Sequence, residues 1–419
     1  MSRLAEELGD DVPAGHRIAL GRTDDGVVRA EECQPILVLG APRTGKTTGF
    51  IVPSLLEWEG PAIITSVRRD VVDATIAARA AIGRASVFEP TGKLGDLPRV
   101  GWDPVQLSDS WDQAFSLAHW LVNSVDKAGV TDGEFWYSEA QRLLAAALRL
   151  ANVDRGSMRA VLTWLQDATN MEMARALDRA GQRVEAQPAN IFSAFTSYPD
   201  VTAGGVRATA LSVLTAYQTD QVLSSTEGEL FDADEFLDGG ANTLYLCVPP
   251  DSQQELAPII TGLVRHLIGK VYGRDSEGRR ITRPLLIALD EAGNVCRLPD
   301  LDRLATTAAG SGMQLVTIFH NMNQAISAYG YERAATIAVN HGAMVVFPGM
   351  REGRTYQMLD EILLPEELPT DVVGRPSSLL RRLQPDETLC IYRHLPPEIL
   401  LTRRSFEDPE LVAAALREP

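Results

Sequence analysis

The sequence predicts an α/β fold built on a mostly parallel β-sheet that is flanked by helices. Short, continuous apolar runs alternate with helical stretches in both halves of the chain, which is typical of buried parallel strands joined by helices. A glycine-rich turn follows the first of these runs, at Gly40–Thr47, and an acidic pair, Asp290 and Glu291, follows a later one. A long block with only helical periodicity lies between these two sites, so we also expect an all-α insertion.

The first part of the α/β pattern ends near residue 105. Residues 1–30 are polar and rich in glycine, and they are expected to form a short strand-and-turn lead-in. Continuous apolar runs then predict three buried strands, namely Ile36–Leu39, Pro61–Thr65 and Ala85–Phe88. The segments between them predict two helices, namely Thr47–Trp58, which Pro53 is expected to interrupt early, and Val71–Ile82.

Between Asp109 and Asp220, Ala and Leu recur at three- and four-residue spacing. This spacing predicts a block that is nearly all helix, with helices at Trp111–Val125, Glu134–Ala151, Met158–Asp167, Met171–Ala180 and Val206–Tyr217. Five tryptophans in or near the block are compatible with base stacking, but their helical context favours packing in the core; they are Trp102, Trp111, Trp120, Trp136 and Trp164.

The α/β pattern resumes after the helical block. A strand at Thr243–Val248 and a helix at Glu255–Tyr272 are followed by a charged loop. Three further apolar runs are expected to complete the sheet, namely Pro284–Leu289, Gln314–Phe319 and Ala343–Phe347.

The composition of the 419 residues, 45% hydrophobic and 23% charged, is that of an ordinary globular protein. The net charge of −17 argues against a broad basic surface for nucleic acid, although a ring can still concentrate a few basic side chains in its pore. The four cysteines lie far apart and form no CxxC pair, so we expect reduced thiols and no zinc site. No run of eighteen apolar residues and no signal-peptide profile occurs, and a cytoplasmic protein is therefore expected.

The glycine-rich turn matches the pattern G-x-x-x-x-G-K-[ST] in full and lies between a predicted strand and a predicted helix. Glycines let the backbone wrap around phosphates, so that amide N–H groups and the helix N-terminus face the anion. In such a loop Lys46 reaches the β and γ phosphates, and the Thr47 hydroxyl coordinates Mg²⁺. The motif therefore predicts a site for ATP and Mg²⁺, with nucleotide contacts from Gly40, Ala41, Pro42, Arg43, Thr44, Gly45, Lys46, Thr47 and Thr48. For Arg43, a solvated position in the loop is the alternative.

The acidic pair supplies the second half of this predicted site. Asp290 and Glu291 directly follow the apolar run Leu285–Leu289, which puts them at the carboxyl edge of a parallel sheet, where ligands bind. Asp290 is expected to hold Mg²⁺, and Glu291 is expected to act as the base that orients the attacking water. A strand followed by Asp-Glu is a weak signal alone, and it gains its weight from the phosphate motif.

With these motifs in place, the chain resembles the TraG/TraD-type coupling ATPases of type IV secretion and conjugation, particularly actinobacterial forms. The resemblance runs from about residue 16 to 411 and rests on VLGAPRTGKTTGFIVPSLLEWEGPAIITSVRRD, SVFEPTG, EFWYSEAQRLLAAALRLA and ALDEAGNVCRLPDLDRLATTAAGSGMQLVTIFHNMNQAISAYG. It implies a RecA-like P-loop nucleotide-binding domain over residues 1–105 and 231–419, with an all-α domain inserted at 106–230.

The resemblance also implies a function and partners. Members of this family are expected to form a hexameric ring that couples ATP hydrolysis to the movement of DNA, or of a relaxase–DNA complex, toward a membrane channel. Members usually begin with transmembrane helices, and this sequence shows none. Either the membrane part is a separate chain that recruits the protein to the inner face of the membrane, or the sequence is a soluble branch of the family or a truncated form.

Two positions depart from the family pattern. Ala309 stands where the family commonly has an arginine that resembles a finger supplied to the neighbouring subunit, and loss of such a finger can cost ~10³–10⁵ in rate. His320 stands where the family has a glutamine thought to sense the γ-phosphate. His320, or Asn321 after it, can hydrogen-bond a phosphate or water, although neither has the reach of glutamine, and a structural role for His320 is the alternative. Arg303 is either a substitute finger or part of a surface ion pair, and Arg68 or Arg69 is a candidate for facing the site.

Three functions remain open at this point. The first is an ATP-driven motor of a conjugative secretion system, which the intact Lys46, Thr47, Asp290 and Glu291 favour. The second is a nucleotide-binding adaptor with weak or no hydrolysis, which Ala309 and His320 favour. The third is a DNA-translocating motor of the FtsK/HerA type, which the helical insertion and the EFW segment make a weaker alternative.

Overall fold

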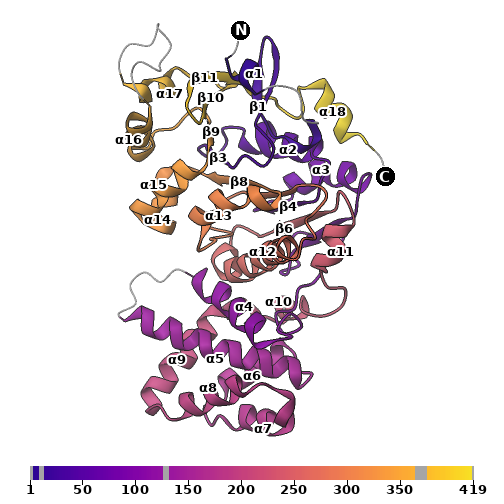
Figure 1. The fold of residues 1–419 in the computed structure, drawn as a ribbon, viewed down its shortest axis with the longest axis vertical. Helices are drawn as coiled ribbons and strands as arrows, with labels where there is room; N and C mark the ends of the chain where they lie inside the picture. The colour runs from indigo at the N-terminus through magenta and orange to yellow at the C-terminus, as the bar shows by residue number, and fades with distance from the viewer. Residues whose placement is uncertain (1–2, 9–13, 126–131, 364–374, 418–419) are drawn as a thin grey trace.

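The computed structural model describes residues 3–8, 14–125, 132–363 and 375–417. These residues form an elongated molecule in which an α/β body, containing a single large sheet, stands on a layer of helices (Figure 1). Both ends of the described chain lie on the α/β body, whereas the middle of the chain builds the helical layer (Figure 1).

The sheet has eleven strands in the described part of the chain. The seven strands from β9 to β5 run parallel to their neighbours, and the remaining four pairs are antiparallel. In sheet order the strands are β2 (Gly26–Arg29), β1 (Ala19–Thr23), β11 (Leu395–Leu401), β10 (Glu387–Tyr392), β9 (Ala343–Val346), β3 (Ile36–Leu39), β8 (Met313–Phe319), β7 (Leu285–Leu289), β4 (Ala62–Ser66), β6 (Thr243–Cys247) and β5 (Ala85–Phe88). This is the α/β fold with a mostly parallel sheet that the sequence predicts.

The expectation that the strand at residue 343 completes the sheet was wrong. β10 and β11 extend the sheet beyond β9, and β1 and β2 extend it further, all in antiparallel pairs. β11 carries Pro396 and Pro397 and is only partly buried, so it lacks the continuous apolar pattern of a central strand. The sequence pattern therefore identified the buried parallel strands and the strand-and-turn lead-in that forms β1 and β2, and it missed β10 and β11 of this antiparallel wing.

The sheet is buried on both faces. Leu37 and Leu39 of β3 belong to one core cluster, whereas Ile36 and Val38 belong to another, as the alternation of side chains along a strand requires. The helices of the α/β body are α1 (Arg3–Glu7), α2 (Val52–Glu57), α3 (Asp70–Ala80), α11 (Ala233–Asp238), α12 (Gln253–Ser276), α13 (Leu301–Thr307), α14 (Met322–Tyr329), α15 (Tyr331–Asn340), α16 (Gly353–Ile362), α17 (Leu379–Arg382) and α18 (Pro409–Ala415).

The helical layer is centred on α5, which contacts α4, α6, α7, α8 and α9. Its helices are α4 (Trp111–Asn123), α5 (Gly133–Val153), α6 (Met158–Gln166), α7 (Met171–Ala180), α8 (Ala186–Thr196), α9 (Asp200–Val213) and α10 (Asp220–Ser224). The five predicted helices are therefore present, α7 with the predicted ends and the other four with shifted ends. α8 was missed because it buries few apolar residues. The domain boundaries at 106 and 230 stay a prediction.

Four of the five tryptophans lie in or against the core, as predicted. Trp102 and Trp164 are buried, and Trp111 and Trp136 pack against the core from partly exposed positions. The ring of Trp120 lies under the Arg265 guanidinium, 4.6 Å from ring centroid to Cζ. All four cysteines are buried free thiols.

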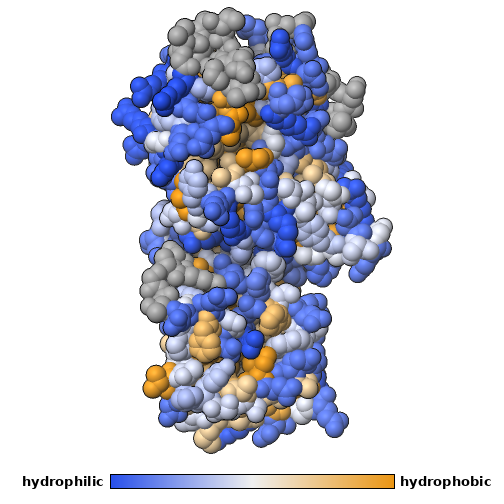
Figure 2. Space-filling view, turned by 60° about the vertical axis from the view of Figure 1, so that its left-hand side comes forward, coloured by the Kyte–Doolittle hydropathy of each residue, from blue (hydrophilic) through white to orange (hydrophobic). Residues whose placement is uncertain are grey.

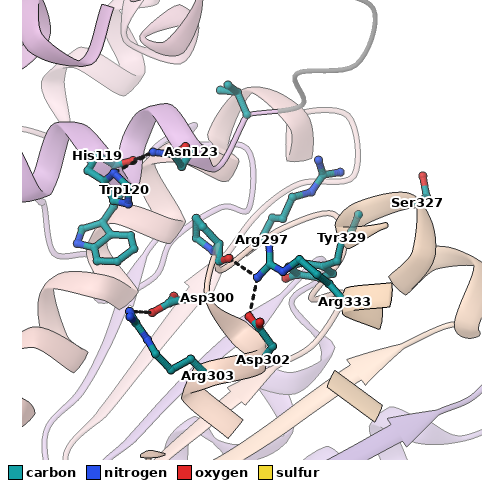
Figure 3. Close-up of a pocket in the computed structure, with 13 residues that line it drawn as sticks. His119, Trp120, Asn123, Arg297, Asp300, Asp302, Arg303, Ser327, Tyr329 and Arg333 are labelled. Atoms are coloured by element: carbon teal, nitrogen blue, oxygen red, sulfur yellow. Dashed lines mark hydrogen bonds and ion pairs between the residues drawn. The ribbon is translucent and has the colours of Figure 1, made fainter. Parts of the chain in front are cut away.

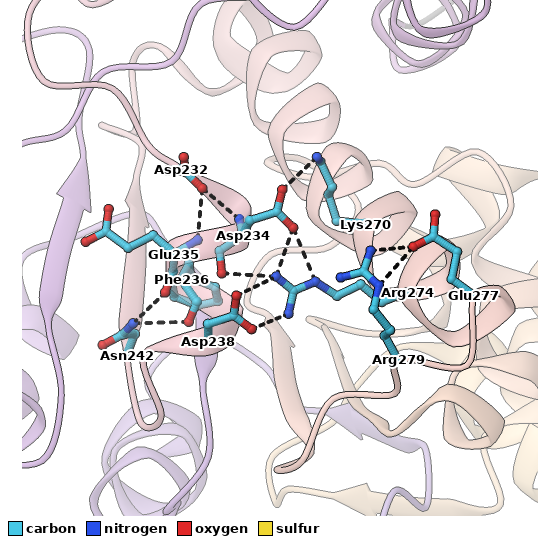
Figure 4. Close-up of polar contacts among 10 residues, drawn as sticks. All are labelled: Asp232, Asp234, Glu235, Phe236, Asp238, Asn242, Lys270, Arg274, Glu277 and Arg279. Atoms are coloured by element: carbon cyan, nitrogen blue, oxygen red, sulfur yellow. Dashed lines mark hydrogen bonds and ion pairs between the residues drawn. The ribbon is translucent and has the colours of Figure 1, made fainter.

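An ionic cluster holds the chain where it returns from the helical layer to the sheet (Figure 4). Arg274 of α12 donates hydrogen bonds to Asp234 and Asp238 of α11, and Lys270 binds Asp234 at 2.9 Å. The Arg274 side chain is only 9% exposed, so these charge-assisted bonds keep a nearly buried guanidinium satisfied. The cluster thereby fixes α11 on α12 immediately before β6.

The remaining short turns are η1 (Ala14–His16), η3 (Gly181–Arg183), η4 (Thr215–Gln218), η5 (Ala309–Ser311) and η7 (Pro376–Ser378). Figure 2 shows hydrophilic side chains over most of one face, with hydrophobic residues scattered among them. Within the described ranges, no helix combines the length and the apolarity needed to cross a membrane.

Candidate functional site

The phosphate loop lies at the carboxyl end of β3, as its sequence predicts. A Cβ at Gly40 would lie 2.8 Å from the Lys46 side chain and 2.9 Å from Cβ of Phe347, so only glycine fits there. Gly45 has φ of +95°, in the left-handed region that favours glycine. Arg43 also has a positive φ, +65°, and its side chain is exposed at the tip of the loop. The two glycines that the motif fixes are therefore both at positions where the backbone favours glycine.

Lys46 is the most deeply buried polar side chain of the loop, at 8% exposure. Its Nζ donates hydrogen bonds to the Gly40 and Ala41 carbonyl oxygens, the second at 3.0 Å. Burial lowers the pKa of Lys46, while the negative charges of Asp290 and Glu291 oppose this shift. The two carboxylates therefore act electrostatically on the phosphate-loop lysine, although 244 residues separate Lys46 from Asp290 along the chain (290 − 46).

The helix after the loop begins with a π-helical turn, η2 (Thr47–Ile51), which continues directly into α2. The Val52 N–H bonds to the Thr47 carbonyl, five residues back, in the π pattern. Pro53, in the first turn of α2, has no N–H, so the Thr48 carbonyl has no donor five residues ahead. The Ser405 N–H, from the C-terminal segment, bonds to the Thr48 carbonyl at 2.8 Å instead.

The expectation that Pro53 interrupts the helix early was therefore wrong. Helical structure continues through Pro53 to Glu57, because the Ser405 N–H replaces the one donor that the proline removes, at the Thr48 carbonyl. The irregularity lies upstream, in the π-helical turn.

Asp290 follows β7 and is 8% exposed. The Thr65 hydroxyl of β4 donates to the Asp290 carbonyl oxygen at 2.7 Å and fixes the backbone there. Burial, together with the adjacent Glu291, raises the pKa of Asp290 to about 7, against the opposing charges of Lys46 and His320. A buried carboxylate that is costly to ionise fits a divalent cation, because the cation would stabilise its charged form.

Glu291 is held at both carboxylate oxygens. Its Oε1 lies 2.8 Å from His320 Nε2, and its Oε2 accepts hydrogen bonds from Gln324 Nε2 at 3.2 Å and Asn294 Nδ2 at 3.3 Å. Its φ of +58° is left-handed, which is strained for a side chain of this size and is common at functional sites. Burial raises the pKa of Glu291, but the His320 and Gln324 contacts and the Lys46 charge outweigh it and lower the pKa overall.

His320 follows β8, the neighbour of β3, and joins this group as the sequence predicts. Its Nδ1 is buried and has no hydrogen-bond partner among the described residues. Asn321 instead caps α14, accepting the Gln324 N–H at 3.0 Å, so its side-chain oxygen is occupied. Sequence reasoning missed Gln324 and Asn294. Their contacts with Glu291 depend on the position of α14 and on the turn after Glu291, which the sequence pattern does not show.

Ala309 and Arg303 lie away from this site. Ala309 precedes β8, at the amino edge of the sheet, whereas the phosphate loop is at the carboxyl edge. Arg303 pairs with Asp300 at 2.8 Å and is 70% exposed, as expected for a surface ion pair. Arg303 lines a cavity of about 670 Å³ between α4 and the α13–α15 region, near Arg333 and Trp120 (Figure 3).

The two arginines after β4 differ in their contacts. Arg69 pairs with Asp73 at 3.0 Å and donates to the Leu94 carbonyl, so its guanidinium is engaged away from the phosphate loop. Arg68 is exposed at the carboxyl edge of the sheet, beside the strand that precedes Asp290. Of the two candidates, only Arg68 has a side chain with no ion pair among the described residues.

The parallel sheet, with the phosphate loop and the acidic pair at one of its edges, identifies the fold as that of a RecA-like P-loop nucleoside triphosphatase. The sequence model of the family described as "Type IV secretory system Conjugative DNA transfer" matches residues 10–361. The chain belongs to this family.

Two relatives illustrate the match. "Conjugal transfer protein TraG" of Escherichia coli is 25% identical over 327 residues, which cover 72% of this chain and 50% of that protein. "Protein VirD4" of Rhizobium radiobacter is 23% identical over 321 residues, covering 74% and 45%. The chain thus spans about half the length of the curated relatives it matches.

The fold is similar to that of solved coupling proteins. The plasmid coupling protein TrwB in complex with the non-hydrolysable ATP analogue ADPNP has a TM-score of 0.73 at 18% identity, covering 96% of this chain and 92% of that one. TrwB in complex with ADP and Mg²⁺ gives a TM-score of 0.72 with similar coverage. At this identity the likeness establishes the fold alone.

Proposed function

We propose that this protein binds ATP with Mg²⁺ at the phosphate loop and hydrolyses it. The observation that carries the proposal is the convergence of Lys46, Asp290 and Glu291 at one edge of the sheet, with the lysine buried under the influence of both carboxylates. Lys46 would exchange its bonds to the Gly40 and Ala41 carbonyls for bonds to the β and γ phosphates. Thr47 and Asp290 would hold Mg²⁺, which neutralises charge that develops on the phosphates.

Within this site, Glu291 would orient the attacking water and accept its proton. His320 and Gln324 hold the two oxygens of Glu291 in defined positions, and a base must be fixed in this way to act on one water. The unpartnered Nδ1 of His320 supports a role for this ring next to the γ-phosphate or the attacking water.

At the level of the cell, we propose a coupling protein that drives DNA, or a relaxase–DNA complex, toward a secretion channel. Membership of the conjugative DNA transfer family supports this function over that of an FtsK/HerA-type motor. The proposal includes assembly into a ring, for which a hexamer is the expected size, and contact with membrane components through a separate partner. Residues 106–230 would form the inserted all-α domain of each subunit.

A nucleotide-binding adaptor with weak hydrolysis is the second candidate, and two observations favour it. Ala309 carries no charge, and His320 stands where the resemblance implies a glutamine that senses the γ-phosphate. The two candidates share nucleotide binding and differ in turnover.

The binding test is the substitution Lys46→Ala, measured by calorimetry with ADP and ATP in the presence of Mg²⁺. We expect binding to become unmeasurable while the thermal unfolding temperature changes little, because the substitution removes a phosphate ligand and few core contacts. Lys93→Ala is the matched control, because Lys93 is an exposed lysine paired with Asp251. Wild-type affinity in Lys46→Ala would end the assignment of the phosphate loop.

A further inference from the structure

The C-terminal segment after β11 lies directly on the first turn of the phosphate-loop helix. The Ser405 N–H bonds to the Thr48 carbonyl, which Pro53 leaves without a helical donor. Three residues earlier, Thr402 approaches so closely that a Cβ at Gly49 would lie 2.3 Å from its Cγ2. Two contacts therefore bring residues 402–405 against the two helix positions that follow the proposed magnesium ligand Thr47.

This segment is held rigidly. Arg403 is 3% exposed and pairs with Glu57 at 2.7 Å and with Asp408 at 2.8 Å, which joins the end of α2 to the start of α18. The N–H groups of Glu407 and Asp408 both bond to the Arg404 carbonyl and close a tight turn. α18 then packs on α2 and α3, as Figure 1 shows. The turn is thus fixed at both ends.

Phe406 is placed at the tip of this turn, one residue beyond the contact with Thr48, and is 61% exposed. Single exposed apolar residues are common on protein surfaces and need no explanation by themselves. This one differs because its backbone is anchored, through Ser405, to a residue that the sequence assigns to nucleotide binding.

The order of the strands indicates which part of a nucleotide would reach Phe406. β3 has β8 and β7 on one side, and these strands supply His320, Asp290 and Glu291. The γ-phosphate belongs on that side, next to the proposed base. The C-terminal segment leaves β11, which lies on the opposite, β9 side of β3. The ribose and base extend from the α-phosphate, the end of the chain of phosphates away from the γ position.

We propose that Phe406 is the platform on which the base of the bound nucleotide stacks. The inference rests on the proposed nucleotide binding and adds the residue that recognises the base. Stacking uses the π-face that every base presents, so Phe406 would hold adenine and guanine nucleotides with similar strength. It would add affinity without contributing to the phosphate contacts.

The test compares ADP, GDP and inorganic tripolyphosphate, each with Mg²⁺, by calorimetry. Phe406→Ala should weaken ADP and GDP binding about tenfold, in line with the known strength of base–aromatic stacking, and leave tripolyphosphate binding unchanged. Phe406→Trp keeps an aromatic face at this position and should bind both nucleotides with the affinity of wild type. Phe135→Ala is the matched control, because Phe135 is 44% exposed on α5 in the helical layer and should change nothing.

Several outcomes would overturn the inference. One is wild-type ADP affinity in Phe406→Ala, and another is an equal loss of ADP and tripolyphosphate binding. Wild type that binds neither ligand would instead reject the proposed nucleotide binding, and this inference with it.

Discussion

At the scale of single residues, the arrangement around Glu291 distinguishes this site from a generic phosphate loop. One oxygen of Glu291 faces His320, and the other accepts bonds from Gln324 and Asn294. Gln324 also accepts the His320 backbone N–H at 2.6 Å, so one amide side chain fixes both residues. The resemblance implies a glutamine in place of His320, and here a glutamine four residues later contacts the proposed base.

The residue-scale prediction concerns Glu291→Gln. This substitution keeps the size of the side chain and removes the proton acceptor, so ATP should remain bound while turnover falls at least ~100-fold. Turnover is measured as phosphate release, and binding is measured by calorimetry on the same preparation. Glu172→Gln, at an exposed glutamate in α7 that pairs with Arg175, is the control. If wild type hydrolyses ATP and Glu291→Gln is equally fast, Glu291 is not the base.

The sequence predicted most of the site at this scale, for a physical reason. The phosphate loop begins directly after the apolar strand β3, and the acidic pair directly follows β7; parallel strands bring their carboxyl ends to one edge. Gln324 lies within a helix whose rotation about its axis decides what its side chain faces. That rotation depends on tertiary packing, which a local pattern does not contain.

At the scale of elements, the π-helical turn and the antiparallel wing belong together. Pro53 leaves the Thr48 carbonyl without a helical donor, and the segment after β11 supplies the Ser405 N–H in its place. A local sequence pattern shows the proline but not the donor that compensates for it, because Ser405 lies 352 positions after Pro53 in the chain (405 − 53). The local pattern therefore predicted that Pro53 interrupts the helix, whereas in the fold a long-range hydrogen bond compensates for the proline.

The element-scale prediction concerns His341, which joins the end of α15 to β8. Its ring hydrogen bonds to the Ile337 carbonyl and the Thr317 hydroxyl, and it is 3% exposed. Burial lowers the pKa of His341 from 6.5 to about 4, and the pKa of the partly buried His266 is also lowered to about 4. The unfolded chain takes up these protons below pH 6.5, whereas the folded protein resists them until near pH 4. The stability they contribute is therefore complete above pH 6.5 and is lost as the pH falls toward 4.

Denaturant titrations at several values between pH 7 and pH 4.5 measure this effect. Each histidine should reduce the free energy of unfolding by up to about 1.4 kcal/mol per pH unit in this window. His341→Gln keeps a polar side chain beside Thr317 and does not titrate. A plot of its free energy of unfolding against pH should therefore be less steep than that of wild type, by the contribution of one proton. Equal slopes in the two proteins would contradict the assignment of His341.

At the scale of the whole molecule, the phosphate loop and Ala309 lie at opposite edges of the sheet. The carboxyl edge carries the phosphate loop and the acidic pair, and the amino edge carries the turn with Ala309 and the exposed Gly310 before β8. A side chain at position 309 lies at the wrong edge to serve the site of its own chain. Such a side chain can act only on another subunit, which is how a finger works in the ring that the resemblance implies.

The last prediction follows from this separation and decides between motor and adaptor. If no other arginine replaces the missing charge, the assembled protein should hydrolyse ATP no faster per subunit than the monomer. Ala309→Arg should then raise the assembled rate at least tenfold, equivalent to ~1.4 kcal/mol in the barrier, and leave the monomer rate unchanged.

The measurement is turnover per subunit against protein concentration, with Arg303→Ala in parallel, because Arg303 is the exposed arginine on α13 between the acidic pair and Ala309. Strong acceleration of wild type on assembly, lost in Arg303→Ala, would identify Arg303 as the finger. Strong acceleration of wild type, with no gain from Ala309→Arg, would show that position 309 does not limit catalysis.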